Sequence, residues 1–360
     1  MLITMRHSRR PAARSPQRGL TLVEVMVAMT IGIILLLALG TLFANSTRVF
    51  KVNDDFARMQ ENGAYALNAI GSDLRQAGFY GLIPSNDVQM PTAIVVTGDC
   101  AAGWATNVGQ PLFGFRGLTP SAAHTALNCI NASNFIDGTA DRPSFILIVR
   151  GATGVAVPNP DAPVLAAGTL YVQSDPNGGI LFRGDQYPAP GPPRRTVLGG
   201  LAAPIYPYQA RAYYLRPCSR PTGSGGTLCL ATDDGNQPIP TLVRQELVGT
   251  TMTERAVAEG IEAVRIVYGV DNDGNGTPDM YTEAPTDIQF TQVVTARVSV
   301  LVRSTKPTNG YNDDSRDYDL NGDGVAELNC TDDGLPCNYH RHVFTQSFQV
   351  RNIAQRLESS

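Results

Sequence analysis

RGLTLVE, at residues 18–24, decides the fold, because it opens a long apolar segment that carries a single acid near its start. From Val25 to Phe43 the chain has no charged residue. A segment of that length and composition is long enough to cross a membrane as a helix. A carboxylate in an otherwise apolar membrane segment is costly, so Glu24 points to a function rather than to packing.

Residues 1–19 form a basic leader with five arginines and no acid, and the leader ends at Gly19. Basic residues before an apolar helix stay on the cytoplasmic side, so we expect the chain after the apolar segment to be exported. Two simpler interpretations compete. An ordinary secretory signal would be cut near residues 38–40, but its apolar region would exceed the usual roughly 7 to 15 residues and would leave Glu24 unexplained. A plain transmembrane anchor would carry Glu24 as an incidental acid near its end.

The leader resembles the class III leader of type IV pilins and of type II secretion pseudopilins. The resemblance implies that an inner-membrane prepilin peptidase cuts between Gly19 and Leu20 and methylates the new amino terminus. Leu20 stands where the family usually has Phe. Glu24 would become the fifth residue of the mature chain, which is the acidic position of the family. Its carboxylate would then pair with the amino terminus of a neighbouring subunit, so that two buried charges satisfy each other.

The helix continues beyond the apolar segment with a changed surface. From Val49 to Ala77 apolar residues recur mostly at steps of three or four, with charged residues between them. No proline occurs from Leu20 to Ala77, and Gly78 is a typical helix stop. We therefore expect one stem helix, with a transmembrane half at residues 20–44 and an amphipathic half at residues 45–80.

Residues 81–360 form the expected head, where short strands alternate with glycine and proline turns. The predicted strands are residues 93–96, 144–149, 168–172, 180–183, 210–215, 241–247, 261–270, 291–302 and 343–350. Alternation in residues 296–302 predicts an antiparallel sheet with one face covered, and the stem helix is the natural cover. The expected fold is α+β and pilin-like: a long N-terminal helix packed on an antiparallel β-sheet head with long, disulfide-stapled loops.

Four segments, residues 73–81, 260–271, 298–304 and 348–352, resemble PilW-type minor pilins. The resemblance implies a minor pilin that helps prime type IV pilus assembly and enters the pilus in a tip or priming complex. The implied partners are prepilin peptidase, the other minor pilins, the major pilin and the inner membrane, with a pilus-tip adhesin as a further candidate. The head would lie in the periplasm before assembly and on the fibre at the cell surface afterwards. A minor pseudopilin of type II secretion has the same leader and remains an alternative.

Six cysteines in an exported domain indicate disulfides, because the periplasm is oxidising. Six cysteines allow fifteen pairings, and the order along the chain suggests three pairs. These are Cys100 with Cys129, Cys218 with Cys229, and Cys330 with Cys337. Zinc binding or a catalytic thiol is the competing interpretation, but the sequence has neither a CxxC pair nor a second close thiol pair beside His340 and His342.

Two acidic loops match the start of an EF-type calcium loop. Each has oxygen ligands at the first, third, fifth and ninth positions, and a glycine at the sixth that lets the seventh backbone carbonyl join. The predicted ligands of the first loop are Asp271, Asp273, Asn275, Thr277 and Asp279. Those of the second loop are Asp319, Asn321, Asp323, Val325 and Glu327.

Calcium affinity should be weak, because the twelfth position holds Thr282 in one loop and Cys330 in the other in place of a bidentate glutamate. We expect a dissociation constant on the order of 10⁻⁴ to 10⁻³ M, as in extracellular modules. The alternative is that the Asn-Gly and Asp-Gly steps are simply good hairpin turns. A calcium-dependent adhesive module on the fibre is therefore a further candidate function.

The charge balance and the motifs argue against two other classes of protein. The chain has 28 basic residues against 32 acids, and without the five leader arginines 23 remain against 32. An acidic chain lacks the electrostatic footprint of a nucleic-acid-binding protein. There is no GxSxG, Walker loop, HExxH or dinucleotide fingerprint, so we expect no enzyme and no required cofactor, with Ca²⁺ as the one candidate ion.

Overall fold

The computed structural model describes residues 19–83, 87–90, 92–117, 119–136, 138, 142–187, 195–197 and 199–358. Leader residues 1–18 therefore lie outside the described residues, whereas Gly19 and Leu20 are described and exposed. Two compact units divide after Asp54, one spanning residues 1–54 and the other residues 55–360.

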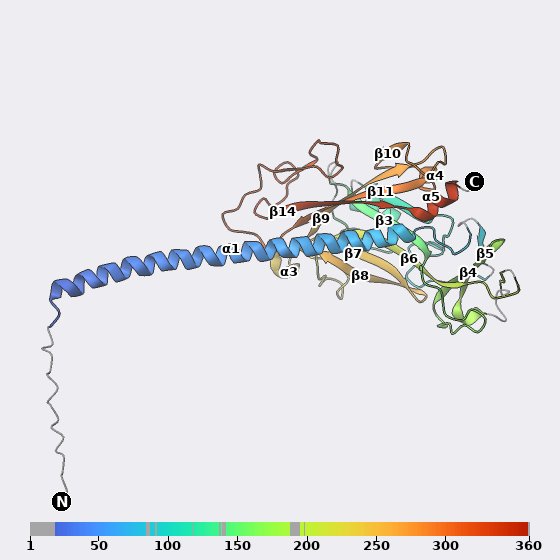
Figure 1. Ribbon diagram of the computed structural model, residues 1–360, viewed down its shortest axis with the longest axis horizontal. Helices are drawn as coiled ribbons and strands as arrows, with labels where there is room; N and C mark the ends of the chain where they lie inside the picture. The colour runs from blue at the N-terminus through green and yellow to red at the C-terminus, as the bar shows by residue number, and fades with distance from the viewer. Residues whose placement is uncertain are drawn as a thin grey trace, which may run out of the picture. The chain divides into compact units, whose positions relative to one another are not determined.

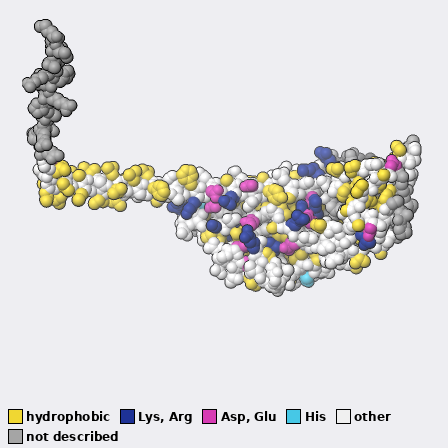
Figure 2. Space-filling view, turned by 90° about the horizontal axis from the view of Figure 1, so that it is seen from below, with side chains coloured by type: hydrophobic (Ala, Val, Ile, Leu, Met, Phe, Trp, Pro, Cys, Tyr) yellow, Lys and Arg dark blue, Asp and Glu magenta, His cyan; other side chains and the backbone are white. Residues whose placement is uncertain are grey.

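The stem helix is confirmed as α1 (Leu22–Gln76), which ends two residues before Gly78. Gly78 has a φ of 72°, in the left-handed region where glycine is favoured as a helix stop. Among the described helices, α1 alone is long and apolar enough to cross a membrane. Figure 2 shows hydrophobic side chains along its N-terminal half and mixed charges over the head.

The second unit contains two main sheets, and both are predominantly antiparallel. The larger sheet has eight strands in the order β1-β5-β4-β6-β3-β2, with β7 added beside β6 and β8 beside β7. The smaller sheet has four strands in the order β10-β9-β11-β14, and a separate hairpin joins β12 to β13. The α+β class and the pilin-like plan of helix and stapled sheet are confirmed.

The strands of the larger sheet are β1 (Val88–Gln89), β2 (Leu112–Gly117), β3 (Ser144–Ala152), β4 (Leu170–Asp175), β5 (Gly178–Arg183), β6 (Ile205–Arg216), β7 (Thr241–Val248) and β8 (Thr251–Glu259). The others are β9 (Ile261–Val270), β10 (Met280–Thr282), β11 (Val293–Arg303), β12 (Asp317–Tyr318), β13 (Leu328–Asn329) and β14 (Arg341–Gln349). Short helices are α2 (Pro120–Ala126), η2 (Ala132–Asn134), η3 (Gly184–Gln186), α3 (Asp233–Asn236), α4 (Asp287–Phe290) and α5 (Arg351–Glu358).

The main core lies where the C-terminal half of α1 meets both sheets. Figure 1 shows this half of α1 with β9, β11 and β14 on one side and β6, β7 and β8 on the other. The residues of α1 that are buried there are Met59, Gly63, Ala66, Leu67, Ile70, Gly71, Asp73 and Leu74. Their spacing of three and four residues is the stripe that the sequence predicts, and it faces strands of both sheets.

Three expectations about the head need correction. Residues 93–96 form no strand, because only the next residue, Thr97, makes an isolated bridge, to Thr251. Strands β2 and β8 were not expected. The four-stranded sheet is also covered on both faces, since Ala263 and Leu301 on its outer side pack against Tyr318 and other residues of the β11–β14 connection.

Two glycines let α1 approach β14 closely. A Cβ at Gly63 would overlap the ring of Phe344, and a Cβ at Gly71 would overlap the ring of Phe348. The guanidinium of Arg75 lies over the Phe348 ring, 5.6 Å from its centroid. The rings therefore occupy the space that side chains would take on an ordinary helix.

Replacing Gly71 with Ala should lower the free energy of unfolding by about 1 to 3 kcal/mol, because the added methyl group overpacks the core. In an open helix the same change would stabilise by about 0.5 to 1 kcal/mol, so the sign of the effect is diagnostic. Urea unfolding of the detergent-solubilised chain measures it. Gly168→Ala, where nothing lies within 4 Å, is the control. A second change, Phe348→Leu, should recover part of the loss, and a stabilised Gly71→Ala protein would contradict the packing.

Candidate functional site

The acidic position of the leader lies in the first turn of α1. The Glu24 carboxylate accepts hydrogen bonds from the Thr21 N–H and from the Thr21 hydroxyl, both at 2.9 Å. The Thr21 hydroxyl in turn accepts from the Glu24 N–H at 3.3 Å. This reciprocal arrangement is a capping box, which satisfies backbone donors at a helix start. In the single chain the Glu24 carboxylate is thus held by its own first turn.

The predicted cleavage site lies immediately before this cap. Gly19, Leu20 and Thr21 precede the helix, have no regular secondary structure and are exposed. The peptide bond between Gly19 and Leu20 therefore lies in an exposed segment outside the helix. Cleavage there would place a free amino group one residue before Thr21, close in sequence to the Glu24 carboxylate.

The first acidic loop connects β9 to β10 and brings three of its predicted ligands together. Carboxylate oxygens of Asp271, Asp273 and Asp279 lie within 4.8 Å of one another. The two oxygens of Asp271 accept from the N–H groups of Gly274 and Gly276, both at 2.7 Å. Burial opposes charge on Asp271, but these backbone bonds outweigh it and hold the pKa of its carboxyl below the usual value.

Side chains at the third, fifth and ninth positions complete the turn. Asp273 accepts from the Asn275 N–H at 3.1 Å, and Asn275 accepts from the Thr277 N–H at 2.8 Å. Asp279 closes the loop by accepting from the Asn272 N–H at 2.7 Å. The loop is therefore folded around its own acidic side chains. The carboxylates of Asp271 and Asp279, from its two ends, both accept bonds from its backbone.

The second acidic loop, between β12 and β13, repeats the same bonds at the same positions. Asp319 accepts from the N–H groups of Gly322 (2.5 Å) and Gly324 (2.9 Å). At the fifth position Asp323 accepts from the Val325 N–H at 2.7 Å. Asn321, at the third, accepts from the Asp323 N–H at 2.9 Å.

The ninth residue of this loop, Glu327, accepts from the Leu320 N–H at 2.6 Å. Three carboxylate oxygens lie within 4.8 Å of one another, one each from Asp319, Asp323 and Glu327. Sequence and structure thus agree that the two loops are copies of one motif.

Arginines distinguish the second loop from the first. The Arg265 Nη1 lies 3.3 Å from the Glu327 Oε1, and Arg297 donates to the backbone carbonyl of Asn321. Burial raises the pKa of Glu327 above its usual value. Among the described residues no ion pair reaches Asp271 or the other carboxylates of the first loop. The first loop is therefore the better candidate for a cation, because a fixed guanidinium disfavours a second positive charge nearby.

The three disulfides join Cys100 to Cys129, Cys218 to Cys229, and Cys330 to Cys337, as the order of cysteines suggested. No free thiol remains among the six cysteines, so none of them is available as a zinc ligand or as a catalytic thiol. The rings of His340 and His342 each pack against a phenylalanine ring. The His340 ring packs 5.3 Å from the Phe56 ring, and the His342 ring packs against Phe344.

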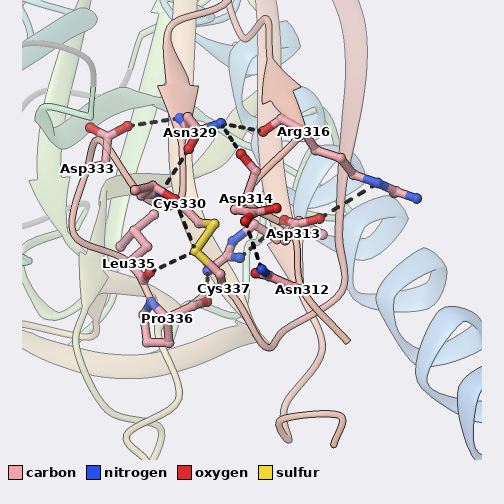
Figure 3. Close-up of a disulfide and its surroundings, with 12 residues drawn as sticks. Asn312, Asp313, Asp314, Arg316, Asn329, Cys330, Asp333, Leu335, Pro336 and Cys337 are labelled. Atoms are coloured by element: carbon pink, nitrogen blue, oxygen red, sulfur yellow. Dashed lines mark hydrogen bonds and ion pairs between the residues drawn. A yellow bond between two sulfur atoms is a disulfide. The ribbon is translucent and has the colours of Figure 1, made fainter. Parts of the chain in front are cut away.

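The Cys330–Cys337 disulfide belongs to the same connection as the second acidic loop. Figure 3 shows the Asn329 side chain beside it. The Asn329 amide donates to the backbone carbonyls of Asp314 (3.0 Å) and Arg316 (3.1 Å). The amide ties the end of β13 to the segment before β12, and the disulfide ties Cys330, directly after β13, to Cys337.

Two buried charged clusters were missed in the sequence. Asp73 of α1, 1% exposed, accepts from the Tyr213 hydroxyl at 2.5 Å and pairs with Arg211. Its position inside the apolar stripe is a signal that could have been used. Arg341 pairs with Glu262 at 2.6 Å and with Asp313 at 3.2 Å, and no local pattern connects three residues so far apart in the chain.

Comparison with known families agrees with these observations. Residues 227–352 match the family described as Type IV Pilus-assembly protein W, and residues 14–40 match the Prokaryotic N-terminal methylation motif. The first match includes both acidic loops, and the second contains Gly19, Leu20 and Glu24. No curated protein and no solved structure matches the chain. Residues 227–352 are thus similar to PilW-type pilus-assembly proteins, and residues 14–40 carry the methylation motif of a prepilin leader.

Proposed function

We propose that this chain is a minor pilin that primes type IV pilus assembly and is built into the pilus within a tip or priming complex. Prepilin peptidase would release Leu20 as the new amino terminus in the inner membrane. Other minor pilins and the major pilin would then pack against the stem, with an adhesin at the tip as a further partner. The head would stand in the periplasm before assembly and on the fibre afterwards.

The observation that carries this proposal is the Thr21–Glu24 cap at the start of an exposed apolar helix. Alone, the carboxylate is satisfied by its own first turn. In an assembled fibre the amino group of a neighbouring subunit would offer it a full charge, and a charge-assisted bond is stronger than a bond to a neutral hydroxyl. The cap would then be exchanged for an intermolecular ion pair, which favours docking in register.

Piliation of an in-frame deletion strain tests the proposal, with surface pili counted by electron microscopy. We expect the deletion to remove pili and the full-length gene to restore them. Glu24→Ala should restore them poorly, by about tenfold or more below wild type, since the intermolecular pair is lost. The same variant should still reach the membrane fraction, because removing a carboxylate makes the segment more apolar.

Glu61→Ala is the matched control, since Glu61 is an exposed acid of the same helix outside the apolar segment. It should restore piliation fully. Normal pili in the deletion strain would refute the priming role. If protein secretion failed in that strain instead, the chain would be a minor pseudopilin of type II secretion. Full rescue by Glu24→Ala would refute the pairing.

We also propose that the first acidic loop binds Ca²⁺ and stiffens the β9–β10 connection, which would make docking of the head calcium-dependent. The convergence of Asp271, Asp273 and Asp279 supports this second role. Calcium binding by this loop is compatible with a minor pilin and with a calcium-dependent adhesive module.

Titration calorimetry of the detergent-solubilised chain should give one site with a dissociation constant on the order of 10⁻⁴ to 10⁻³ M. Asp271→Asn should remove this heat. Asp319→Asn should leave it, because the second loop already holds Arg265 and Arg297 beside its acids. The control is Asp287→Asn, at the start of α4. An absence of heat up to several millimolar calcium would refute the site.

A further inference from the structure

Strand β14 is the outermost strand of the four-stranded sheet, and only one of its two edges is paired. Its pairing with β11 runs without a register shift over all nine residues, from Arg341 opposite Arg303 to Gln349 opposite Thr295. No described strand pairs with its other edge. An unpaired edge of this length is a template for another strand, because each outward N–H and C=O still needs a partner.

The backbone bonds at its two ends show which residues face outward. The Ser304 N–H donates to the His340 carbonyl, and the Val350 N–H donates to the Val294 carbonyl. Bonded pairs alternate along an antiparallel ladder, so even-numbered residues of β14 direct their backbone groups toward β11. The odd-numbered residues therefore direct their N–H and C=O groups away from the sheet: Arg341, Val343, Thr345, Ser347 and Gln349.

The other edge strands, β1, β2, β8 and β10, differ from β14. Strand β2 is shorter and carries the exposed Arg116. Strand β10 has three residues and β1 has two, which is too short to template a long partner. Strand β8 carries exposed Glu254 and Arg255 and has a register shift against β7. By contrast, residues 343–350 contain no charge and no proline. Natural edge strands are usually blocked by such devices, so an unblocked one indicates a partner.

The direction of β14 limits what that partner can be. Gly63 faces Phe344 and Gly71 faces Phe348, so β14 runs in the same direction as α1. Eight helical residues rise about 12 Å and four strand residues about 13 Å, so the two elements stay in step. An antiparallel pair of β14 strands from two copies would direct their α1 helices oppositely. Two subunits whose α1 segments beside β14 point the same way cannot adopt this arrangement.

We propose that β14 accepts an extended strand from the head of a different pilin subunit, which hydrogen-bonds to the outward backbone groups of its odd-numbered residues. This proposal rests on the proposed function, since it assumes neighbouring pilins. Thr345 and Ser347 are exposed and uncharged, so the added strand would be uncharged where it crosses them. When a strand is added to a sheet edge, main-chain hydrogen bonds supply the affinity and the flanking side chains supply the specificity.

In-cell photo-cross-linking tests the proposal. A photoreactive phenylalanine replaces the exposed Gln346 in the full-length chain, in a strain that makes the other pilins, and the cross-linked peptide is identified by mass spectrometry. We expect that peptide to come from a β-strand of another subunit with a prepilin leader. Ser347→Pro should lower the cross-linked product by about tenfold, because it removes an outward N–H without breaking a bond to β11. Ser347→Ala keeps the N–H and should not lower it.

Three results would overturn the proposal: a cross-link to β14 of a second copy, a cross-link to no strand of any pilin, or equal product from Ser347→Pro and Ser347→Ala. If Ser347→Pro lowers the protein level, Thr345→Lys supplies a charged edge instead and should give the same loss. The pilus count remains a separate readout. Normal pili in the deletion strain, together with a strand-to-strand cross-link, would refute priming and leave the edge pairing standing.

Discussion

Replacing Arg341 with Met lowers the free energy of unfolding by about 3 to 5 kcal/mol, the largest single effect that we expect in the head. The Arg341 side chain has no exposed surface, and its two carboxylate partners, Glu262 and Asp313, are also buried. Burial works against the charge of Arg341, but these two carboxylates hold its pKa above the usual value. Without the guanidinium, Asp313 would keep only the exposed Arg316 as an ion-pair partner, and Glu262 would keep only Arg303, whose Nη1 lies 3.9 Å from the Glu262 Oε1.

The control uses the same carboxylate. Arg316 also pairs with Asp313, at 3.8 Å, but 56% of its side chain is exposed. Arg316→Met should therefore cost no more than about 1 kcal/mol. Urea unfolding of the detergent-solubilised chain compares the two variants, and equal losses would show that burial does not govern this cluster. Adding Glu262→Gln and Asp313→Asn to Arg341→Met should recover much of the stability, because the unpaired charges are then absent.

Replacing Asp73 with Ala should lower the free energy of unfolding by about 2 to 4 kcal/mol. The change removes the carboxylate to which the Tyr213 hydroxyl donates at 2.5 Å, in the core between α1 and the larger sheet. It also removes the ion pair with Arg211. That part is the smaller one, because the Arg211 side chain is 25% exposed and can be solvated.

A double-mutant cycle isolates the hydrogen bond. Tyr213→Phe should destabilise the wild-type chain but have little further effect in the Asp73→Ala chain, since the bond is already lost. Urea unfolding measures both steps. Additive effects of the two substitutions would contradict the contact. Glu61→Ala, an exposed acid of the same helix, should change stability by less than about 0.5 kcal/mol.

Much of the fold was predictable where one residue type recurs at a fixed period. The stem stripe, the paired cysteines and the two acidic loops are local patterns, and the structure contains the helix, the three disulfides and the loop turns. Eight predicted strands also correspond to strands of the structure, with ends shifted by a few residues. Their apolar alternation reports burial directly.

The missed strands lack that signal. Strand β2 contains Gly114 and ends at Gly117, so its sequence resembles a turn. Strand β8 is an edge strand with most of its side chains exposed, which makes it look like a polar loop. Residues 93–96 show the opposite failure: their β-branched side chains favour a strand, but they pair with none of the described strands. Strand formation depends on a partner that one segment of sequence does not name.

The Arg341 cluster shows the limit of sequence reasoning for the candidate sites. Glu262 follows the start of β9, Asp313 lies in the β11–β14 connection, and Arg341 begins β14. Tertiary folding brings the three together, and each alone reads as an ordinary surface charge. Glu24 could be identified because its surroundings are local and apolar. The pairing of an acid with a distant arginine has no such signature.

The parallel course of α1 and β14 has a mechanical consequence for a subunit that transmits tension. A pull along the helix axis would slide the helix against the strand. The contact between Gly63 and Phe344 and the contact between Gly71 and Phe348 would then carry the load together. Elements pulled along their common axis must break their contacts at once, whereas elements peeled from one end lose them singly. A pull along this part of α1 therefore loads its contacts with β14 in shear, so that both contacts resist it together.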